Sequence, residues 1–501
     1  MDRSKSAVTV LLAMLLILSC CPVTVLAENS VEGDMGIEDS FFGILAQGSC
    51  GENLEWTMYD DGMLYIAGSG AMEDYADSYV PWSSYMDMIT NVVMDQGITH
   101  IGSIAFANLT NLTSVMIPDS VTSIGDRAFQ GSTALTTVDI PDSVTTLGFN
   151  VFYGCSGLTE IALPDSVTTW GNGVFNGCIG LKSFTIPNGV TEIGQSVFSG
   201  CTGLQEIGFH QNVTTIGKAA FYGCTGLTEI DIPDSVTTIG EHAFYGCTGL
   251  QTITIPNSVT TMEEYAFDGC SGLTEITIPD SITIIENGMF LDCTGLTTVH
   301  LPDTLVTIDD YAFHGCTGLQ EIIFPESLTT IGWNAFEECR SLTSIVFPKN
   351  LTDIGAYAFQ YCTALRELTF EAETVPSVKA GVFIATAVEV AYVPAAGRAE
   401  YGMHLMDDLP EGALIVTSAV PQCVIAVFSG EQQMQYAEQN AMLLMAVYDE
   451  YGRCLGVTGT MEQSAGGIYE MLVQAEGIET VRLFVMDSSY APMRVPYVFE
   501  K

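Results

Sequence analysis

Hydrophobic residues return at fixed positions through the middle of the chain, with a period of 23 residues. One position of the period is phenylalanine in twelve successive units, and another is cysteine in ten, with no insertion between units. The phenylalanines are Phe106, Phe129, Phe152, Phe175, Phe198, Phe221, Phe244, Phe267, Phe290, Phe313, Phe336 and Phe359. The cysteines are Cys155, Cys178, Cys201, Cys224, Cys247, Cys270, Cys293, Cys316, Cys339 and Cys362. A uniform period between 20 and 29 predicts a solenoid, here of about twelve 23-residue coils.

The first part of each unit predicts a short strand. In the unit over residues 227–249, Leu227, Ile230 and Ile232 have the spacing of a strand whose apolar side faces inward. The β-branched side chains of the two isoleucines favour a strand over a helix. Pro233 has no N–H to donate and is expected to end the strand.

The second part of the unit brings the chain back to the core. Val236 and Ile239 are predicted to point inward, and Gly240 to permit a tight bend. Residues 243–247 are expected to fill the far side from a short helical or 3₁₀ turn. Because one unit alone cannot bury its apolar residues, the units must stack, with strands about 4.8 Å apart.

The repeated pattern L-x-x-I-x-I-P-x-x-V-T-x-I-G-x-x-A-F-x-G-C resembles the BspA-like leucine-rich repeats of bacterial surface and secreted proteins. This resemblance implies a mainly β fold, a curved, right-handed leucine-rich repeat parallel β-solenoid, with no catalytic activity. It also implies adhesion to host matrix proteins such as fibronectin or fibrinogen, or to other cells. The departures are local: Leu109 and Ser132 replace cysteine, and Glu263, Glu286 and Asp309 replace glycine, which we expect to loosen single coils.

The flanks of the repeat array predict further modules. Asp61-Gly62 between alternating apolar runs indicates a hairpin in an N-terminal β cap. Phe383 lies one residue out of phase in a degenerate last coil. Strand-like runs over 441–448 and 480–487 suggest a small immunoglobulin-like β-sandwich. The predicted organisation is a signal peptide (1–27), a linker and β cap (28–97), the solenoid (98–394), a linker (395–412) and the β-sandwich (413–501).

The N-terminal residues are typical of a secretory signal peptide. Basic residues precede an apolar run over 7–18, and Ala27 ends a short cleavage sequence. The alternative is lipoprotein processing at Cys20 or Cys21, which the bulky Leu18 fits poorly. Either route predicts a secreted or cell-surface protein.

Charge excludes two classes of partner. Lys and Arg total 14 against 60 Asp and Glu, a formal net charge of −46. Nucleic acid and an anionic membrane surface would both repel such a chain. No later apolar run reaches the roughly 20 residues needed to span a bilayer, and no catalytic or cofactor motif is present. We therefore expect a monomer without cofactors that is not an enzyme and has no transmembrane segment in its mature form.

The cysteine row allows two interpretations. It could form metal sites or disulfides between coils, or consist of free thiols that pack as small apolar groups. Structural zinc sites use paired ligands such as C-x-x-C, which the chain lacks. Parallel coils also hold equivalent cysteines slightly too far apart for an unstrained disulfide. Free, buried thiols are the prediction.

The third and fifth residues of each predicted strand should face solvent on the concave sheet. This places carboxylates and hydroxyls in rows along one groove. Such a groove could bind a basic protein patch, a glycan or Ca²⁺; alternatively, it is a solvated surface kept soluble by its charge. The candidate binding residues are Glu160, Glu206, Glu229, Asp231, Glu275, Glu321 and Glu367.

Tyrosines recur beside the core phenylalanine, among them Tyr153, Tyr222 and Tyr245. Exposed tyrosines often anchor interfaces, but they also occur as rim residues with buried rings and solvated hydroxyls.

Together these features predict an exported, non-enzymatic binding protein that recognises an extracellular protein or glycan, as an adhesin does. The alternative is a structural or scaffolding component of the cell envelope, retained there by the C-terminal domain.

Overall fold

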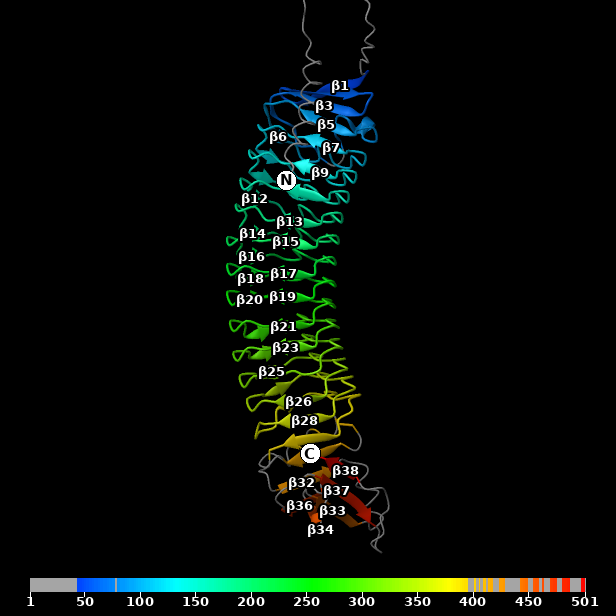
Figure 1. Cartoon of the computed structure of the whole chain (residues 1–501), viewed down its shortest axis with the longest axis vertical. Coiled ribbons are helices and arrows are strands. Elements are labelled where there is room, and N and C mark those ends of the chain that lie inside the picture. The colour runs from blue at the N-terminus through cyan, green and yellow to red at the C-terminus, as the bar shows by residue number, and fades with distance from the viewer. Residues whose placement is uncertain are drawn as a thin grey trace, which may run out of the picture. The chain divides into compact units, whose positions relative to one another are not determined.

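The computed structural model describes residues 43–76, 79–394, Tyr401, Leu405, 409–410, 413–417 and seven further strands between residues 423 and 500. The predicted signal peptide lies outside the described residues. Nearly all the regular structure is β-strand, arranged as stacked coils of the chain (Figure 1).

The first strands form a cap in which antiparallel pairing changes to parallel pairing. The elements are β1 (Ile44–Gly51), β2 (Leu54–Tyr59), β3 (Met63–Gly68), β4 (Gly70–Ala71), the 3₁₀ turn η1 (Ser83–Tyr85), β5 (Asn91–Met94) and β6 (Ile98–Ile101). Strands β1, β2 and β3 pair antiparallel, β3 pairs parallel with β5, and β5 pairs parallel with the first strand of the repeats. The cap thus covers the strand edge that the first coil would expose.

Most coils contribute two short strands, one to each of two parallel ladders, and the coil that contains Glu321 contributes only to the second. The first ladder contains β7 (Ser114–Met116), β9 (Thr137–Asp139), β11 (Glu160–Ala162), β13 (Ser183–Thr185), β15 (Glu206–Gly208), β17 (Glu229–Asp231), β19 (Thr252–Thr254), β21 (Glu275–Thr277), β23 (Thr298–His300), β26 (Ser344–Phe347) and β28 (Glu367–Phe370). The second contains β8 (Ser123–Ile124), β10 (Thr146–Leu147), β12 (Thr169–Trp170), β14 (Glu192–Ile193), β16 (Thr215–Ile216), β18 (Thr238–Ile239), β20 (Thr261–Met262), β22 (Ile284–Ile285), β24 (Thr307–Ile308), β25 (Thr330–Ile331), β27 (Asp353–Ile354) and β29 (Ser377–Val378). Partners are offset by one unit, as in Glu229 opposite Thr252 and Thr238 opposite Thr261. The predicted parallel solenoid is confirmed.

The phenylalanines form one continuous spine inside the coils. From Phe106 to Phe359, the ring centroids of successive phenylalanines lie 5.2 to 5.7 Å apart in stacked arrangements. Trp82 stacks on Phe106 at 5.7 Å, and Phe383 stacks on Phe359 at 5.9 Å. The spine therefore extends into the cap and the degenerate last coil.

The far side of the coil differs from the predicted helical turn. His242 and Gly246 both have left-handed backbones, with φ of 56° and 66°, and the other coils repeat this pair of positions. Two left-handed residues four apart cannot continue a right-handed helical turn. Their N–H groups instead donate to the next coil, to the carbonyl oxygens of Glu264 at 3.2 Å and Asp268 at 2.7 Å. Backbone hydrogen bonds thus join the coils on this side as well as in the ladders.

Gly240 has a different role from the predicted bend, because its backbone is not left-handed. A Cβ atom at Gly240 would lie 2.8 Å from the backbone carbon of Gly217 in the preceding coil. The glycine is needed because the two coils approach each other closely.

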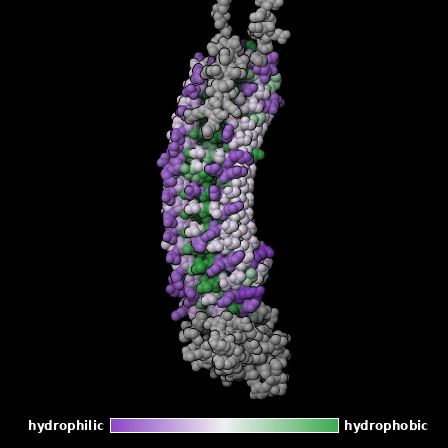
Figure 2. Space-filling model, in the orientation of Figure 1, coloured by the Kyte–Doolittle hydropathy of each residue, from purple (hydrophilic) through white to green (hydrophobic). Residues whose placement is uncertain are grey.

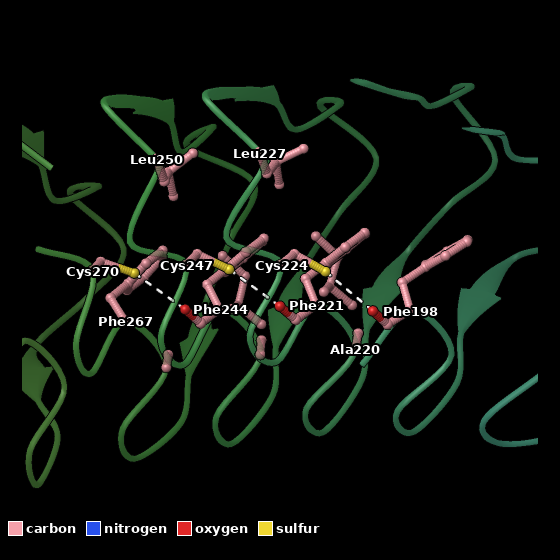
Figure 3. Close-up of a cluster of buried hydrophobic side chains, with 14 of the residues drawn as sticks. Phe198, Ala220, Phe221, Cys224, Leu227, Phe244, Cys247, Leu250, Phe267 and Cys270 are labelled. Atoms are coloured by element: carbon pink, nitrogen blue, oxygen red, sulfur yellow. Dashed lines mark hydrogen bonds between the residues drawn. The ribbon is translucent and has the colours of Figure 1, made fainter. Parts of the chain in front are cut away.

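The ten cysteines of the repeat row are free and buried, as predicted. Each thiol donates a hydrogen bond to the carbonyl oxygen of the phenylalanine 26 residues earlier, as Cys247 does to Phe221 at 3.1 Å (Figure 3). In the second unit the hydroxyl of Ser132 makes the equivalent bond to Phe106 at 2.9 Å. This substitution therefore keeps the hydrogen bond that the thiols make.

The last coil leads directly into the C-terminal strands. These are β30 (Val390–Val393), β31 (Leu414–Thr417), β32 (Cys423–Phe428), β33 (Met442–Tyr448), β34 (Cys454–Thr458), β35 (Glu462–Gln463), β36 (Tyr469–Gln474), β37 (Thr480–Met486) and β38 (Tyr497–Glu500). One sheet runs from β26 through β28, β30, β31, β32 and β36 to β35, and a second has the order β34-β33-β37-β38. The strand-like runs predicted over 441–448 and 480–487 are found as β33 and β37. An immunoglobulin-like domain beginning at residue 413 stays a prediction.

The segment predicted as a linker contains two core residues. The side chains of Tyr401 and Leu405 are fully buried. The Tyr401 hydroxyl donates to the carbonyl oxygen of Ala372 at 2.8 Å, and its ring lies 5.1 Å from that of Phe370. These two residues therefore belong to the packing of the last coil.

Candidate binding surface

The first ladder presents its outer residues to solvent in every coil. In β17, Glu229 and Asp231 are exposed and Ile230 between them is buried, and most three-residue strands of this ladder repeat the pattern. We call these exposed positions the strand face, with a first row that contains Glu229 and a second row that contains Asp231. The alternation follows from the strand geometry, in which successive side chains point to opposite sides.

All seven predicted binding residues are exposed on the strand face. Six carboxylates lie in the first row and Asp231 lies in the second. Glu321 lies in a segment without regular strand pairing, but it keeps the alternation, because Ile322 beside it is buried. A binding role for these residues stays a prediction.

Carboxylates and hydroxyls alternate along most of the first row. Strand pairing places Thr137 opposite Glu160, Ser183 opposite Glu206, Glu229 opposite Thr252, Glu275 opposite Thr298, and Ser344 opposite Glu367. Such a row offers acceptors and hydroxyl donors at each step of roughly 5 Å.

The charge on this row is densest at its centre. Glu206 and Glu229 occupy neighbouring coils without a hydroxyl between them, so two carboxylates lie roughly one strand spacing apart. Like charges at this separation repel each other by about 1 kcal/mol in water, and a cation between them would relieve that repulsion. Glu275 is already partnered, because its Oε1 lies 2.9 Å from Nε2 of His300 in the second row of the next coil.

One part of the strand face is apolar, which the sequence reasoning missed. Ile323 and Val346 follow one another in the second row and are 72% and 49% exposed. Glu321 and Glu367 lie beside them in the first row. The signal was present in the sequence, because most other units have a polar or small residue at this position. Exposed aliphatic side chains beside carboxylates are typical of a contact point for a protein partner.

The predicted tyrosines do not lie on the strand face. Tyr153 and Tyr222 are 43% and 39% exposed on the far side of the coils, and the ring of Tyr222 stacks on that of Tyr245 at 4.5 Å. Asp268 is buried on the same side. Its burial, followed by the charge of Asp292, raises the pKa of its carboxyl to about 7.

The described residues contain no cluster of three or more metal-ligating side chains. In the part of the chain with a described structure, no helix has the length and apolar character to cross a bilayer. On one side of the coils, hydrophobic side chains form a stripe along the stack beside hydrophilic ones (Figure 2).

Comparison with known sequences decides the family. A profile of the BspA type leucine rich repeat region matches six copies, over residues 84–205, 168–297 and 283–397, which is more than half of the chain. The chain belongs to this family. No curated protein sequence matches this BspA-type repeat protein.

Experimental structures of bacterial proteins resemble this BspA-type repeat protein. A leucine-rich repeat protein from Bacteroides ovatus is 26% identical, and the match covers 74% of this chain and 99% of that chain with a TM-score of 0.54. A leucine rich cell surface protein from Faecalibacterium prausnitzii is 30% identical over 64% of this chain and 94% of that chain, with a TM-score of 0.43. A leucine-rich repeat protein from Eubacterium ventriosum is 30% identical over 58% and 94%, with a TM-score of 0.40. The first of these supports the same repeat fold.

Proposed function

We propose that this BspA-type protein is an exported, non-enzymatic binding protein that recognises a cationic patch on an extracellular protein through its strand face. The observation that carries this proposal is the first row, which has six exposed glutamates, five of them in paired strands. Host matrix proteins such as fibronectin and fibrinogen are the candidate partners, as members of this family suggest.

The physical basis is complementarity between two extended surfaces. The row fixes the spacing of its carboxylates through the backbone, so little order has to be gained at these positions on binding. Lysine and arginine side chains on a partner would meet carboxylates at Glu206 and Glu229 and an apolar contact at Ile323 and Val346. Charge would mainly set the rate of association, and the apolar contact would slow dissociation.

Charge reversal tests this proposal. The triple variant Glu206→Lys, Glu229→Lys and Glu275→Lys should weaken binding to immobilised fibronectin or fibrinogen at least tenfold, an effect of about 1.4 kcal/mol or more. Raising the salt concentration should also weaken binding of the wild-type protein to fibronectin or fibrinogen, because salt screens the charges.

The matched control carries Asp142→Lys, Asp234→Lys and Asp280→Lys. These three exposed aspartates lie at coil corners outside the strand face. Both triple variants change the net charge from −46 to −40, because each exchange adds two positive charges. Equal weakening by both variants would mean that only overall charge matters, and unchanged binding by the first would place the site elsewhere.

A structural role in the cell envelope is the second candidate. The pairing of β30 with β31 and of β31 with β32 favours it, because the C-terminal strands extend the sheet of the solenoid. This role requires tight retention on isolated cell walls. Retention without binding to either matrix protein would favour it over recognition of a soluble partner.

A further inference from the structure

A groove crosses the far side of the first five repeat coils, away from the strand face. It has a volume of about 660 Å³, and one residue from each of these coils lines it in a row: Ser103, Asp126, Phe149, Asn172 and Gln195. Tyr153, which follows Phe149 by four residues in the same coil, also lines the groove. Both aromatic side chains are accessible to a ligand, since Phe149 is 53% and Tyr153 is 43% exposed.

One groove position, Gly173, has no side chain. The next row of the groove contains Arg127, Asn150, Gly173 and Ser196, all with left-handed backbones. At Gly173 a Cβ atom would lie 2.1 Å from Oδ1 of Asn150. The Asn150 amide therefore lies over a position that carries a side chain in most other coils.

The backbone of the groove is not available to a ligand. The N–H of Arg127 donates to the carbonyl oxygen of Phe149 at 2.8 Å, and that of Asn150 donates to Asn172 at 2.9 Å. A peptide that binds as an added strand needs free backbone groups, and here the coils use them to join each other. Recognition must therefore come from side chains.

The side chains that remain combine aromatic faces with polar groups. Asp126 accepts from the N–H of Phe149 through Oδ1 at 2.8 Å, and Asn172 accepts from the N–H of Gln195 through Oδ1 at 3.1 Å. In the described structure, Oδ2 of Asp126 and Nδ2 of Asn172 have no hydrogen-bond partner, so an acceptor and a donor flank the Phe149 ring on its two neighbouring coils. Asn176, which also carries an amide, lines the groove together with Tyr153.

This combination fits a sugar ring. A pyranose has an apolar C–H face that packs on an aromatic ring, and equatorial hydroxyls that reach donors and acceptors around the ring. In these coils the phenylalanine ring centroids of the spine lie 5.5 to 5.7 Å apart, and neighbouring strands are about 4.8 Å apart. A step of this size is comparable with the length of one pyranose residue in a linear chain. The groove lining contains one carboxylate, that of Asp126, and one guanidinium, that of Arg127. Because these two charges offset each other, the groove favours a neutral ligand.

We propose that this groove binds a neutral linear oligosaccharide, with Phe149 and Tyr153 as stacking platforms. The site is separate from the strand face, so it stands or falls independently of the protein partner.

Isothermal titration of the purified protein with cellohexaose, mannohexaose and xylohexaose tests the proposal, with hexagalacturonate as the charged comparison. At least one neutral hexasaccharide should bind, and the double variant Phe149→Ala and Tyr153→Ala should weaken that binding about tenfold or more. Because both side chains are exposed, the thermal midpoint of the variant should stay that of the wild type.

The repeat supplies a matched control. Trp333 and Tyr222 occupy the same two positions in later coils, are 43% and 39% exposed, and lie outside the groove. The double variant Trp333→Ala and Tyr222→Ala should bind the sugar as the wild type does.

Four outcomes would overturn the proposal. These are no binding of any neutral hexasaccharide at millimolar concentration, binding of hexagalacturonate alone, undiminished sugar binding by the Phe149 and Tyr153 variant, and equal loss in the control variant. If the third outcome is accompanied by loss of fibronectin or fibrinogen binding, the groove would be assigned to a protein partner.

Discussion

The interior spine and the strand face are built by the same repeat, yet they differ in how many residue types each position accepts. Inside, one position is phenylalanine in twelve successive units, and every ring is fully buried against the next. On the strand face, the equivalent position changes between glutamate, threonine and serine from coil to coil. Packing accepts few side chains because a buried ring must fill a fixed space, whereas an exposed position accepts many.

Specificity in such a chain resides in the exposed positions. The spine fixes the spacing of the coils, and the ladder carries this spacing to the surface. The identity of each exposed residue is then free to match a partner without affecting the fold.

Alkaline pH should have the largest effect, because it acts on the whole interior. Burial raises the pKa of the Cys247 thiol from about 9 to about 12, and it raises the pKa of every other cysteine in the row. The unfolded chain loses these protons near pH 9 while the folded chain keeps them, so this stability is complete below about pH 9 and is lost as the pH rises towards 12. Each thiol contributes about 1 kcal/mol to this loss by about pH 10.

Ten such contributions sum to about 10 kcal/mol, a large part of the stability of a folded protein, so we expect the thermal midpoint to fall steeply between about pH 9 and pH 10. Circular dichroism and thiolate absorbance, measured together during an alkaline titration, check this. Thiolate formation at pH 9 in a chain that stays folded would contradict burial of the row.

Removing one ring of the spine should have the next largest effect. Phe244 stacks on Phe221 at 5.4 Å and on Phe267 at 5.3 Å and is fully buried. Phe244→Ala should reduce the free energy of unfolding by about 3–5 kcal/mol, measured by urea denaturation. Tyr222→Ala, at an exposed position, should cost less than about 1 kcal/mol, and similar costs for both would erase the distinction between interior and surface.

A residue at the margin between the two regions should have an intermediate effect. The hydroxyl of Ser235 is half-buried at a coil corner and donates to the carbonyl oxygen of Val213 at 2.6 Å. Ser235→Ala should cost about 1 kcal/mol of stability. Its exposed neighbour Asp234 is the control, and Asp234→Ala should stay within about 0.5 kcal/mol of the wild type in the same denaturation experiment.

The strand face should show the smallest effect on stability. Glu229 is exposed, so Glu229→Gln should leave the free energy of unfolding within about 0.5 kcal/mol of the wild type. The same variant should weaken binding to a cationic protein. A clear loss of stability would mean that the first row supports the fold as well as a partner.

The repeat period was sufficient to predict the ladders and the spine. A strict interval of 23 residues places equivalent side chains opposite each other, and burial of Phe, Cys and Ile follows from their chemistry. Phe383 was recognised one residue out of phase, and its ring still stacks on Phe359.

Other features depend on contacts that the sequence of one unit does not contain. The left-handed backbone at His242 could not be predicted from a glycine, because neighbouring coils have Ala219 and Tyr265 at the equivalent position. The role of Gly240 arises from the backbone of the preceding coil. The far-side groove likewise requires residues from five coils, and the burial of Tyr401 requires its contact with Phe370. These features could be recognised only once the coils were stacked.

The uninterrupted register has a genetic consequence. Each coil contacts mainly its two neighbours. After an in-frame loss or gain of one whole 23-residue unit, the phenylalanines and cysteines on either side of the junction would therefore still stack on each other. Unequal recombination could therefore shorten or lengthen the protein in steps of a single coil, and descendants would differ in how many exposed carboxylates they offer while keeping the same interior.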